Sequence, residues 1–255
     1  MKVVEVFFSP TGGTKKVTDT LANALAEKLA CGTVKTDVTV HGDAVAEIGK
    51  DDVCVMGVPS FGGRVPHVAA ERLSALRGNG ARAVAVCVYG NRAYEDTAVE
   101  LEDLAAAAGF NVIGVVAAVA EHSIARRYAA GRPDAEDIGT LLGYASRIAD
   151  KVKSGDMSVP RVPGDRPYKK SGGGAVVPKP DKHCTKCGVC AAECPVQVID
   201  PSDPAVTDKK KCVSCMRCVA VCPHKARKVS RVVLAAVNAM LKKSCSDRKE
   251  YELYL

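Results

Sequence analysis

Residues 3–14 read VVEVFFSPTGGT and join a short apolar run to a loop rich in glycine and hydroxyl side chains. Lys15–Ala30 follows, with apolar side chains at spacings of four. This pattern predicts a buried strand, a loop and a helix. The free amides and the dipole of a helix N-terminus favour an anion, and the hydroxyls of the loop add hydrogen-bond donors. We therefore expect a phosphate site in this loop.

Three further apolar runs are rich in β-branched residues and end in turn-forming residues; they are residues 53–58, 83–89 and 112–119. Such runs are typical of strands buried on both faces of a parallel sheet. Residues 34–40 alternate apolar and polar side chains, which favours an edge strand. Helical patterns lie between the strands, at residues 65–76, 96–108 and 135–153, with a poorly defined one near Gly42–Gly49. The alternation predicts a doubly wound α/β domain with right-handed crossovers.

Composition divides the chain into four parts. Residues 1–154 form the predicted α/β domain. Residues 155–182 contain five prolines and the run Gly172-Gly173-Gly174, so we expect a linker or an extended strap. Residues 183–230 hold eight of the twelve cysteines. Residues 231–255 are expected to form a helix over Arg231–Lys243, followed by a polar tail.

The eight cysteines form two runs of the pattern C-x2-C-x2-C-x3-C, each followed by proline. The pattern is typical of [4Fe–4S] ligation, in which the fourth cysteine of each run ligates the other cluster. This crossed assignment gives cluster I Cys184, Cys187, Cys190 and Cys222, and cluster II Cys212, Cys215, Cys218 and Cys194. Zinc is the alternative, but a zinc ion needs only four ligands, and zinc knuckles use two C-x2-C pairs or histidines. The repeat therefore predicts two iron–sulfur clusters.

The cysteine repeat resembles a bacterial two-cluster ferredoxin, and that resemblance implies a small hairpin at residues 198–206. The first domain resembles flavodoxin, whose FMN phosphate loop has the motif [ST]-x-T-G-x-T. Ser9, Thr11, Gly12 and Thr14 match this motif. The flavodoxin resemblance implies a five-stranded parallel sheet of order 2-1-3-4-5. Over nearly its whole length the chain resembles the flavodoxin–ferredoxin fusion proteins, often called ferrodoxins, of anaerobic bacteria and archaea.

The resemblance to flavodoxin implies that FMN contacts the phosphate loop and two further loops, residues 59–64 and 89–94. Phe61, Tyr89 and Tyr94 are expected to offer stacking surfaces to its ring. The alternative is that each aromatic side chain packs only its own loop. The predicted FMN-binding residues are Ser9, Pro10, Thr11, Gly12, Gly13, Thr14, Pro59, Ser60, Phe61, Gly62, Gly63, Tyr89, Gly90, Asn91, Arg92 and Tyr94.

Arg64 and Arg92 lie in these two loops, where ordinary flavodoxins carry acidic side chains. A cation beside the flavin is expected to stabilise its reduced anion and raise its potential; the alternative is that both arginines point to solvent. The segments AEHS (residues 120–123) and AGRPD (residues 130–134) resemble motifs of the fusion family. Neither has a clear chemical role in the sequence, although Pro133 with Asp134 is able to start a helix.

The charge of the chain is uneven. Residues 1–155 carry 17 basic and 19 acidic side chains, a balance of −2, and residues 156–255 carry 19 and 10, a balance of +9. No basic stripe interleaved with aromatic residues accompanies this excess, so we expect no nucleic-acid partner. No secretory signal or membrane-length apolar stretch is found, which predicts no membrane span and a cytoplasmic location, where clustered cysteines favour metal ligation. Four cysteines remain as packing or incidental thiols: Cys31, Cys54, Cys87 and Cys245.

These features predict an electron-transfer protein that passes single electrons between two [4Fe–4S] clusters and FMN, with no catalytic side chain. The partner is expected to be an unidentified redox protein, docked by basic residues such as Lys169-Lys170 and Lys242-Lys243. One alternative is an FMN-dependent reductase of a quinone or nitro compound, which needs an open cavity near Phe61, Tyr94 and His122. The other is an iron–sulfur binding or sensing module whose flavodoxin-like domain lacks FMN.

Overall fold

The computed structural model describes residues 1–40, 46–171 and 176–255. Five parallel strands form the centre of the first domain, in the order β2-β1-β3-β4-β5. They are β1 Val3–Phe7, β2 Thr33–Asp37, β3 Val53–Pro59, β4 Arg82–Tyr89 and β5 Asn111–Val119. This order is that of the flavodoxin-like fold and confirms the predicted fold class. Every residue of β1 is buried, as its apolar run predicts.

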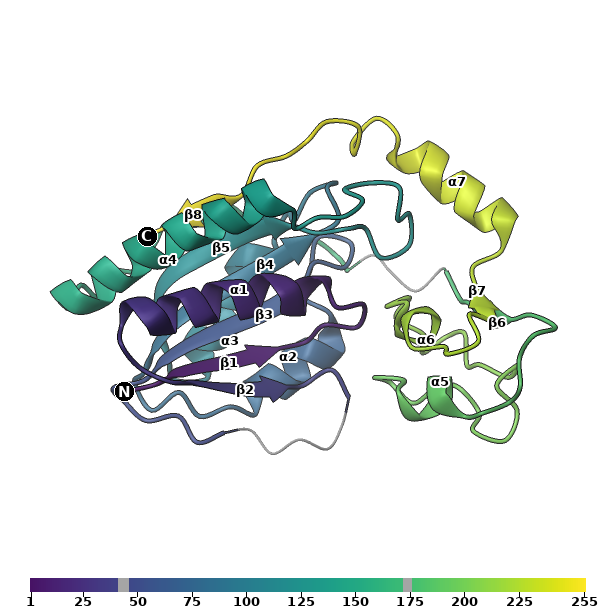
Figure 1. Cartoon of the computed structure of the whole chain (residues 1–255), viewed down its shortest axis with the longest axis horizontal. Coiled ribbons are helices and arrows are strands. Elements are labelled where there is room, and N and C mark those ends of the chain that lie inside the picture. The colour runs from purple at the N-terminus through teal and green to yellow at the C-terminus, as the bar shows by residue number, and fades with distance from the viewer. Residues whose placement is uncertain (41–45, 172–175) are drawn as a thin grey trace.

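Two helices cover each face of this sheet (Figure 1). The first face carries α1 Gly13–Lys28 and α4 Ala135–Ser154, and the second carries α2 His67–Ser74 and α3 Thr97–Ala107. Each face has its own apolar core, because successive side chains of a buried strand point to opposite faces. The helix predicted near Gly42–Gly49 falls partly outside the described residues, and residues 46–49 form no helix. In the part of the chain that is described, no helix is long and apolar enough to cross a bilayer.

The C-terminal residues add a sixth strand to the sheet. Strand β8, Glu252–Tyr254, pairs antiparallel with β5, and Val115 lies opposite Tyr254. The tail reaches this edge by running back from helix α7, Arg231–Leu241 (Figure 1). The sequence predicts only a polar tail here. A strand of three residues is too short to produce a periodic pattern, and its pairing depends on the free edge of β5.

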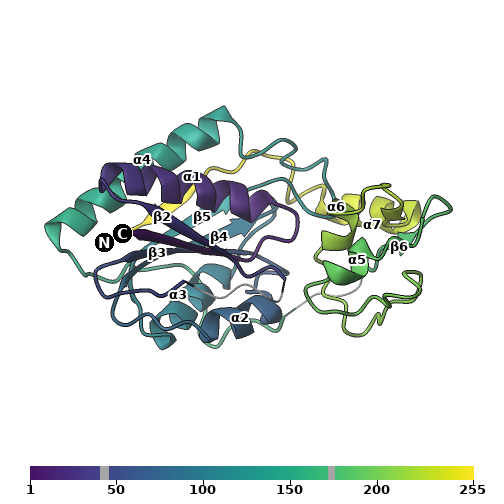
Figure 2. The same ribbon diagram turned by 60° about the horizontal axis from the view of Figure 1, so that its bottom comes forward.

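The cysteine module consists of loops and short elements at one end of the sheet (Figure 2). These elements are β6 Lys179–Pro180, α5 Val189–Ala192, α6 Arg217–Ala220 and β7 Arg227–Lys228. The expected hairpin is present: Ile199 bridges Thr207, and the amide of Asp208 donates to the carbonyl of Val198 at 2.8 Å. The apolar cluster of the module consists of Cys190, Ala191, Cys194, Val198, Ile199 and Cys218. Half of that cluster is cysteine, so the module has a small apolar core. Domains of this size commonly gain further stability from a bound metal centre.

Residues 155–171 run along α3 as an extended strap. The amides of Asp165 and Lys169 donate to the carboxylate of Asp96 at 3.0 and 2.7 Å. Arg166 pairs with Asp103 at 2.7 Å. The residues Gly172, Gly173 and Gly174 of the same predicted linker lie outside the described residues. The strap therefore fixes the chain on the second face of the sheet before it enters the cysteine module.

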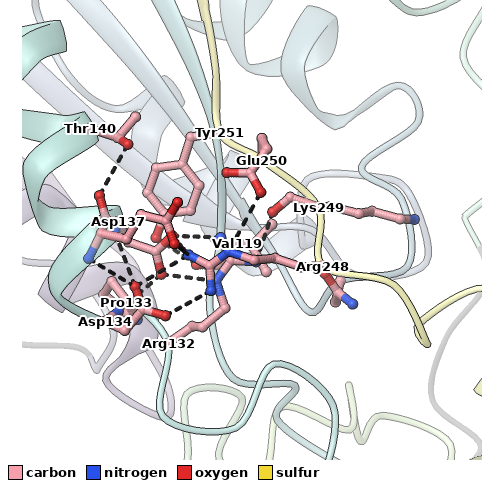
Figure 3. A network of polar contacts seen from close by, with 12 residues as sticks. Val119, Arg132, Pro133, Asp134, Asp137, Thr140, Arg248, Lys249, Glu250 and Tyr251 are labelled. Atoms are coloured by element: carbon pink, nitrogen blue, oxygen red, sulfur yellow. Dashed lines mark hydrogen bonds and ion pairs between the residues drawn. The ribbon is translucent and has the colours of Figure 1, made fainter.

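A buried polar network fixes the C-terminal tail against the start of α4 (Figure 3). Arg132 and Asp137, with exposed fractions of only 7% and 2%, form a bidentate ion pair at 2.9 and 2.5 Å. The remaining amino group of Arg132 donates to the carbonyl of Lys249 at 2.7 Å. Arg248 pairs with Asp134 at 2.8 Å and with Asp137 at 3.1 Å. The segment 130–134, for which the sequence offers no chemical role, thus anchors the tail.

Candidate cofactor sites

Four cysteines line one small cavity of the module, of about 20 Å³. They are Cys184, Cys187, Cys190 and Cys222. The other walls are mostly apolar and come from β6, α5 and the loop that follows Cys222. Cys187 is exposed, so this first cysteine cavity lies near the surface of the molecule.

The other four cysteines line a second cavity, also of about 20 Å³. They are Cys194, Cys212, Cys215 and Cys218. Cys194, Cys215 and Cys218 are buried, so the second cysteine cavity is the deeper of the two. In each cavity three cysteines of one run meet the fourth cysteine of the other run. The structure thus brings together the eight predicted ligands in two crossed sets.

Left-handed backbone turns gather the first three cysteines of each run. Lys186 and Gly188 have positive φ angles of 55° and 78° in the first run, and Ser214 and Met216 have 53° and 62° at the same offsets in the second. Residues other than glycine adopt a positive φ only at a cost in free energy. Its recurrence at the same offsets indicates that both runs need the same loop conformation. A short helix, α5 or α6, then begins in each run and moves the chain toward the fourth cysteine, which therefore lines the other cavity.

The geometry of both sites fits an extended cluster better than a single ion. A zinc ion requires its sulfur ligands about 2.3 Å from one point. Across the residues that the structure describes, no three His, Cys, Asp or Glu side chains converge in this way. Instead, four thiols surround each cavity. An iron–sulfur cubane has separate corners for four thiolates, so this donor set and its spacing fit such a group.

Burial raises thiol pKa values in both cavities, at Cys190 in the first and at Cys212, Cys215 and Cys218 in the second. Burial raises the pKa of Cys215 to about 12 and that of Cys218 to about 11, although the positive charge of Arg227 opposes the shift at Cys218. Burial also raises the pKa of Cys222, but backbone amides that include Ala226, at 3.3 Å, outweigh it and hold the pKa below its ordinary value. The buried thiols ionise only when a cation or metal centre compensates the charge.

A third cavity, of about 70 Å³, lies at the carboxyl ends of the parallel strands. Ligands of open α/β sheets bind at this edge. Ten of the predicted FMN-binding residues line it: Ser9, Pro10, Thr11, Gly13, Thr14, Pro59, Ser60, Phe61, Tyr89 and Gly90. The three loops selected from the sequence therefore meet around one cavity, which we call the sheet-edge cavity.

The phosphate loop presents an uncapped helix N-terminus to the sheet-edge cavity. Gly12, with φ of 90°, is the N-cap residue of α1 and has no side chain with which to cap the helix; of the first-turn amides, that of Lys15 is bonded by Ser9. The hydroxyl of Ser9 is occupied, because it accepts the amide of Lys15 at 2.9 Å. The first turn of α1 holds no acidic residue. The remaining amides and the helix dipole are therefore able to bind an anion.

Six predicted FMN-binding residues do not line the sheet-edge cavity: Gly12, Gly62, Gly63, Asn91, Arg92 and Tyr94. The returning tail engages three of them, since the ammonium of Lys249 donates to the carbonyl of Arg92. The hydroxyl of Tyr94 bonds to Glu252 and Tyr254 at 2.9 Å, and the amide group of Asn91 donates to the carbonyls of Cys245 and Asp247. The sequence assigned these side chains to the flavin because nothing in it indicated that the tail returns. A direct flavin contact from the six stays a prediction.

The two arginines of the ring loops have carboxylate partners. Arg64 forms a bidentate pair with Glu100 at 2.6 and 2.8 Å, and Arg92 pairs with Glu95 at 2.8 Å. Neither arginine lines the sheet-edge cavity. The sequence did not indicate these ion pairs, and the expected effect of the two arginines on the flavin potential stays a prediction.

The sheet-edge cavity also has walls outside the predicted FMN-binding residues: Val88, Ala120, Glu121, His122, Ser123 and Cys215. Of these, the sequence places His122 at the cavity of the reductase alternative and Cys215 among the cluster ligands. Residues 120–123 follow β5, so the rule that sites form at the carboxyl ends of strands would have found them. The ring of His122 accepts the amides of Ile124 and Ala125 at 3.1 Å through Nδ1, and burial lowers its pKa. A side chain at Gly90 would lie 2.7 Å from this ring, which explains the glycine.

Cys215 connects the two parts of the molecule, because it lines both the sheet-edge cavity and the second cysteine cavity. Two arginines hold the parts together beside it. Arg217 pairs with Glu193 and donates to the carbonyl of Pro10 in the phosphate loop at 3.4 Å. Arg72 of α2 donates to the carbonyl of Pro195 at 2.7 Å. The deeper cysteine site therefore lies against the phosphate loop.

Comparison with known proteins finds one matching family model and a set of similar solved structures. Residues 183–226 match the 4Fe-4S dicluster domain. No curated protein sequence matches the chain. An archaeal flavodoxin structure covers 60% of the chain and 99% of its own length at 18% identity, with a TM-score of 0.45. A flavodoxin of Streptococcus pneumoniae TIGR4 covers 59% and 99% at 20% identity, with a TM-score of 0.43.

A two-electron reduced flavodoxin of Megasphaera elsdenii covers 57% of the chain and 98% of its own length at 18% identity, with a TM-score of 0.40. The fold of the first domain rests on its own strand order, described above. The chain is therefore similar to a flavodoxin-like domain followed by a 4Fe-4S dicluster module.

Proposed function

We propose that this chain is an electron-transfer protein that holds two [4Fe–4S] clusters and one FMN and passes single electrons between them. One observation carries the proposal: Cys215 is a wall of both the second cysteine cavity and the sheet-edge cavity. Groups bound in the two cavities would be neighbours, with no intervening domain. Placing redox groups next to one another is the main task of a protein in this kind of chemistry.

Cys184, Cys187, Cys190 and Cys222 would hold cluster I, and Cys194, Cys212, Cys215 and Cys218 would hold cluster II. The lining of the two cysteine cavities supports this crossed assignment. Apolar side chains that include Val196, Val198 and Ile199 line the second cavity and would keep water away from its ligands. Exclusion of solvent is one of the levers by which a protein sets the potential of a cluster.

The uncapped N-terminus of α1 would hold the phosphate of FMN, with Thr11 and Thr14 as hydroxyl donors. Phe61, Tyr89 and His122 line the remainder of the sheet-edge cavity and would enclose the ring system. When bound, the clusters carry single electrons and FMN carries one or two. The residues of this chain bind and orient these groups and exclude water, and the function requires no nucleophile or general base.

The exposed end of the first cysteine cavity is the natural place for a redox partner. Cys187 is exposed there, and the nearby Lys182 and Lys225 are exposed as well. A basic surface of this kind favours an acidic partner by steering its approach. Lys169, which the sequence offered for the same task, instead pairs with Glu95. The partner is therefore proposed to dock at the cysteine module and not at the strap.

Anaerobic purification followed by iron, sulfide and flavin analysis tests the proposal. We expect about eight irons per chain and one FMN. In Cys215→Ala the iron content should fall by about half, because only cluster II loses a ligand. Flavin reduction by a protein donor should then slow at least tenfold. Cys31→Ala is the matched control, since Cys31 lies outside all three cavities, and it should change neither quantity.

Three results would contradict parts of the proposal. Iron and sulfide without flavin after reconstitution would favour the sensing module. Turnover with quinones or nitro compounds, but none with protein carriers, would favour the reductase. Full iron content in both Cys194→Ala and Cys222→Ala would overturn the crossed ligand sets.

A further inference from the structure

Arg227 of β7 carries a charge that is closed off from solvent. Its exposed fraction is 2%, the lowest of any arginine among the buried residues. The same side chain lines both the first and the second cysteine cavity. A single buried cation therefore lies between the two predicted cluster sites.

The hydrogen bonds of Arg227 leave part of the guanidinium without a partner. One amino group donates to the carbonyl of Pro204 at 2.6 Å, and the other donates to the hydroxyl of Thr207 at 2.8 Å. The first amino group also lies 3.8 Å from the sulfur of Cys190. Nε is buried and has no acceptor within the described ranges. A guanidinium has five N–H donors, and these neutral acceptors use only some of them.

No carboxylate compensates this charge: among the ion pairs of the described residues, Arg227 forms none. Its neighbours differ in this respect. Lys228, the next residue, is exposed and pairs with Asp181 at 2.6 Å, and Arg217 pairs with Glu193. Burying an unpaired guanidinium is costly, so its retention requires an anion that forms later or binds there. An iron–sulfur cubane with its four thiolate ligands carries a net negative charge. A cubane in each cysteine cavity would supply the missing anion on both sides of Arg227.

We propose that Arg227 is a shared potential-setting residue for both clusters. Reduction of a cluster adds one electron to a site that is already negative. A buried cation stabilises the reduced form more than the oxidised form and raises the potential, and low local polarity strengthens the effect. Because Arg227 lines both cavities, it should act on both clusters at once. This inference rests on the proposed function, and it concerns how this chain tunes the groups that it holds.

Redox titration of the anaerobically purified protein, followed by electron paramagnetic resonance, tests the proposal. In Arg227→Gln the equilibrium constant for reduction of each cluster should fall at least tenfold. For a one-electron couple this lowers each midpoint potential by at least 59 mV. Arg227→Lys keeps the charge, so both potentials should stay close to those of the unmodified protein. Lys228→Gln removes the same charge one residue away at an exposed position, and it should move neither potential. Iron and sulfide content is measured first in every variant.

The outcomes separate the two proposals. Absence of clusters in the unmodified protein contradicts the proposed function and this inference with it. With about eight irons present, unchanged potentials in Arg227→Gln overturn only the role of Arg227. A fall in one potential alone overturns the shared role. Loss of a cluster in both Arg227→Gln and Arg227→Lys, with the circular dichroism spectrum retained, assigns Arg227 to the structure of the module and overturns its role in setting the potentials.

Discussion

Glu5 is a carboxyl group in the middle of the central strand β1, with an exposed fraction of 0%. The hydroxyl of Thr18 donates to Oε1 at 2.6 Å, and the ammonium of Lys35 lies 3.6 Å from Oε2. Oε2 has no hydrogen-bond donor in the described part of the chain. Burial therefore raises the pKa of Glu5 from 4.5 to about 7, despite the hydrogen bond from Thr18.

The raised pKa of Glu5 predicts a loss of stability as the pH rises. Between pH 4.5 and about 7 the unfolded chain releases the proton while the folded chain keeps it, so the free energy of unfolding falls; above pH 7 the loss is complete. Glu5→Gln removes this loss and should be more stable than the unmodified protein at pH 8 by about 3 kcal/mol. Urea unfolding at pH 5 and pH 8 measures the difference.

The control for this experiment is Glu27→Gln, because Glu27 is an exposed carboxylate on α1. Its unfolding free energy should follow the pH dependence of the unmodified protein. If Glu5→Gln also keeps that dependence, Glu5 is ionised in the folded protein at neutral pH, and our account of its environment is wrong.

The C-terminal tail is the element that most changes the predicted architecture. Strand β8 closes the free edge of β5, and the hydroxyl of Tyr251 donates to the carbonyl of Val119 at 2.7 Å. Cys245, which the sequence predicts to be an incidental thiol of a polar tail, is buried against Ala125 and Tyr128. The tail thus returns the end of the cysteine module to the first domain, and the Arg132–Asp137 pair fixes it there (Figure 3).

Replacing Arg132 should release the tail. Arg132→Gln leaves Asp137 buried with only Arg248 as a cationic partner, and loss of one member of a buried pair costs about 3–5 kcal/mol. We expect the lower end of this range and faster proteolysis after residue 245. Arg126→Gln, in the same loop, removes an ion pair with Glu121 in which Arg126 is largely exposed, and it should cost about 0–1 kcal/mol. Equal unfolding free energies for the two variants would contradict the anchoring role.

At the scale of the whole molecule, contacts at the carboxyl edge of the sheet set the distance between the predicted flavin and cluster sites. Arg72 is central among them. Its guanidinium donates to the carbonyls of Val38 and Thr39 in the first domain, both at 2.6 Å, and to Pro195 in the cysteine module. One side chain therefore joins a loop after β2 to the residue that follows Cys194.

Arg72→Met should loosen this junction without unfolding either part. Hydrogen bonds from a charged donor contribute about 1.5–3 kcal/mol each, so amide hydrogen exchange at residues 196–199 should accelerate at least tenfold. Arg77→Met is the control, since Arg77 is exposed one turn later in the chain. Unchanged exchange in Arg72→Met would show that the remaining connections, which are the strap, the C-terminal tail and the contact of Arg217 with Pro10, hold the module in place without it.

Local sequence predicted the strands, the helices and the cysteine ligands, because each signal lies within a few contiguous residues. The apolar run of β1 and the loop Ser9–Thr14 needed no knowledge of the rest of the chain. The ring loops were harder. Phe61 and Tyr89 line the sheet-edge cavity, in agreement with their predicted place beside the flavin. Tyr94, predicted to do the same, instead bonds to Tyr254 of β8, which lies 160 residues away along the chain. No pattern within the loop distinguishes these two destinations for an aromatic side chain.

The sequence by itself determined a parallel α/β domain and eight cysteines in a dicluster pattern, since hydrophobic periodicity and ligand spacing are local properties of the chain. Only the tertiary structure decided that Cys215 faces two cavities, that Arg227 lies between both cysteine sites, and that the tail completes the sheet. These contacts join residues that are distant in the chain. They depend on how finished elements pack and on which buried charges that packing leaves without a partner, and neither property is written in any short stretch of sequence.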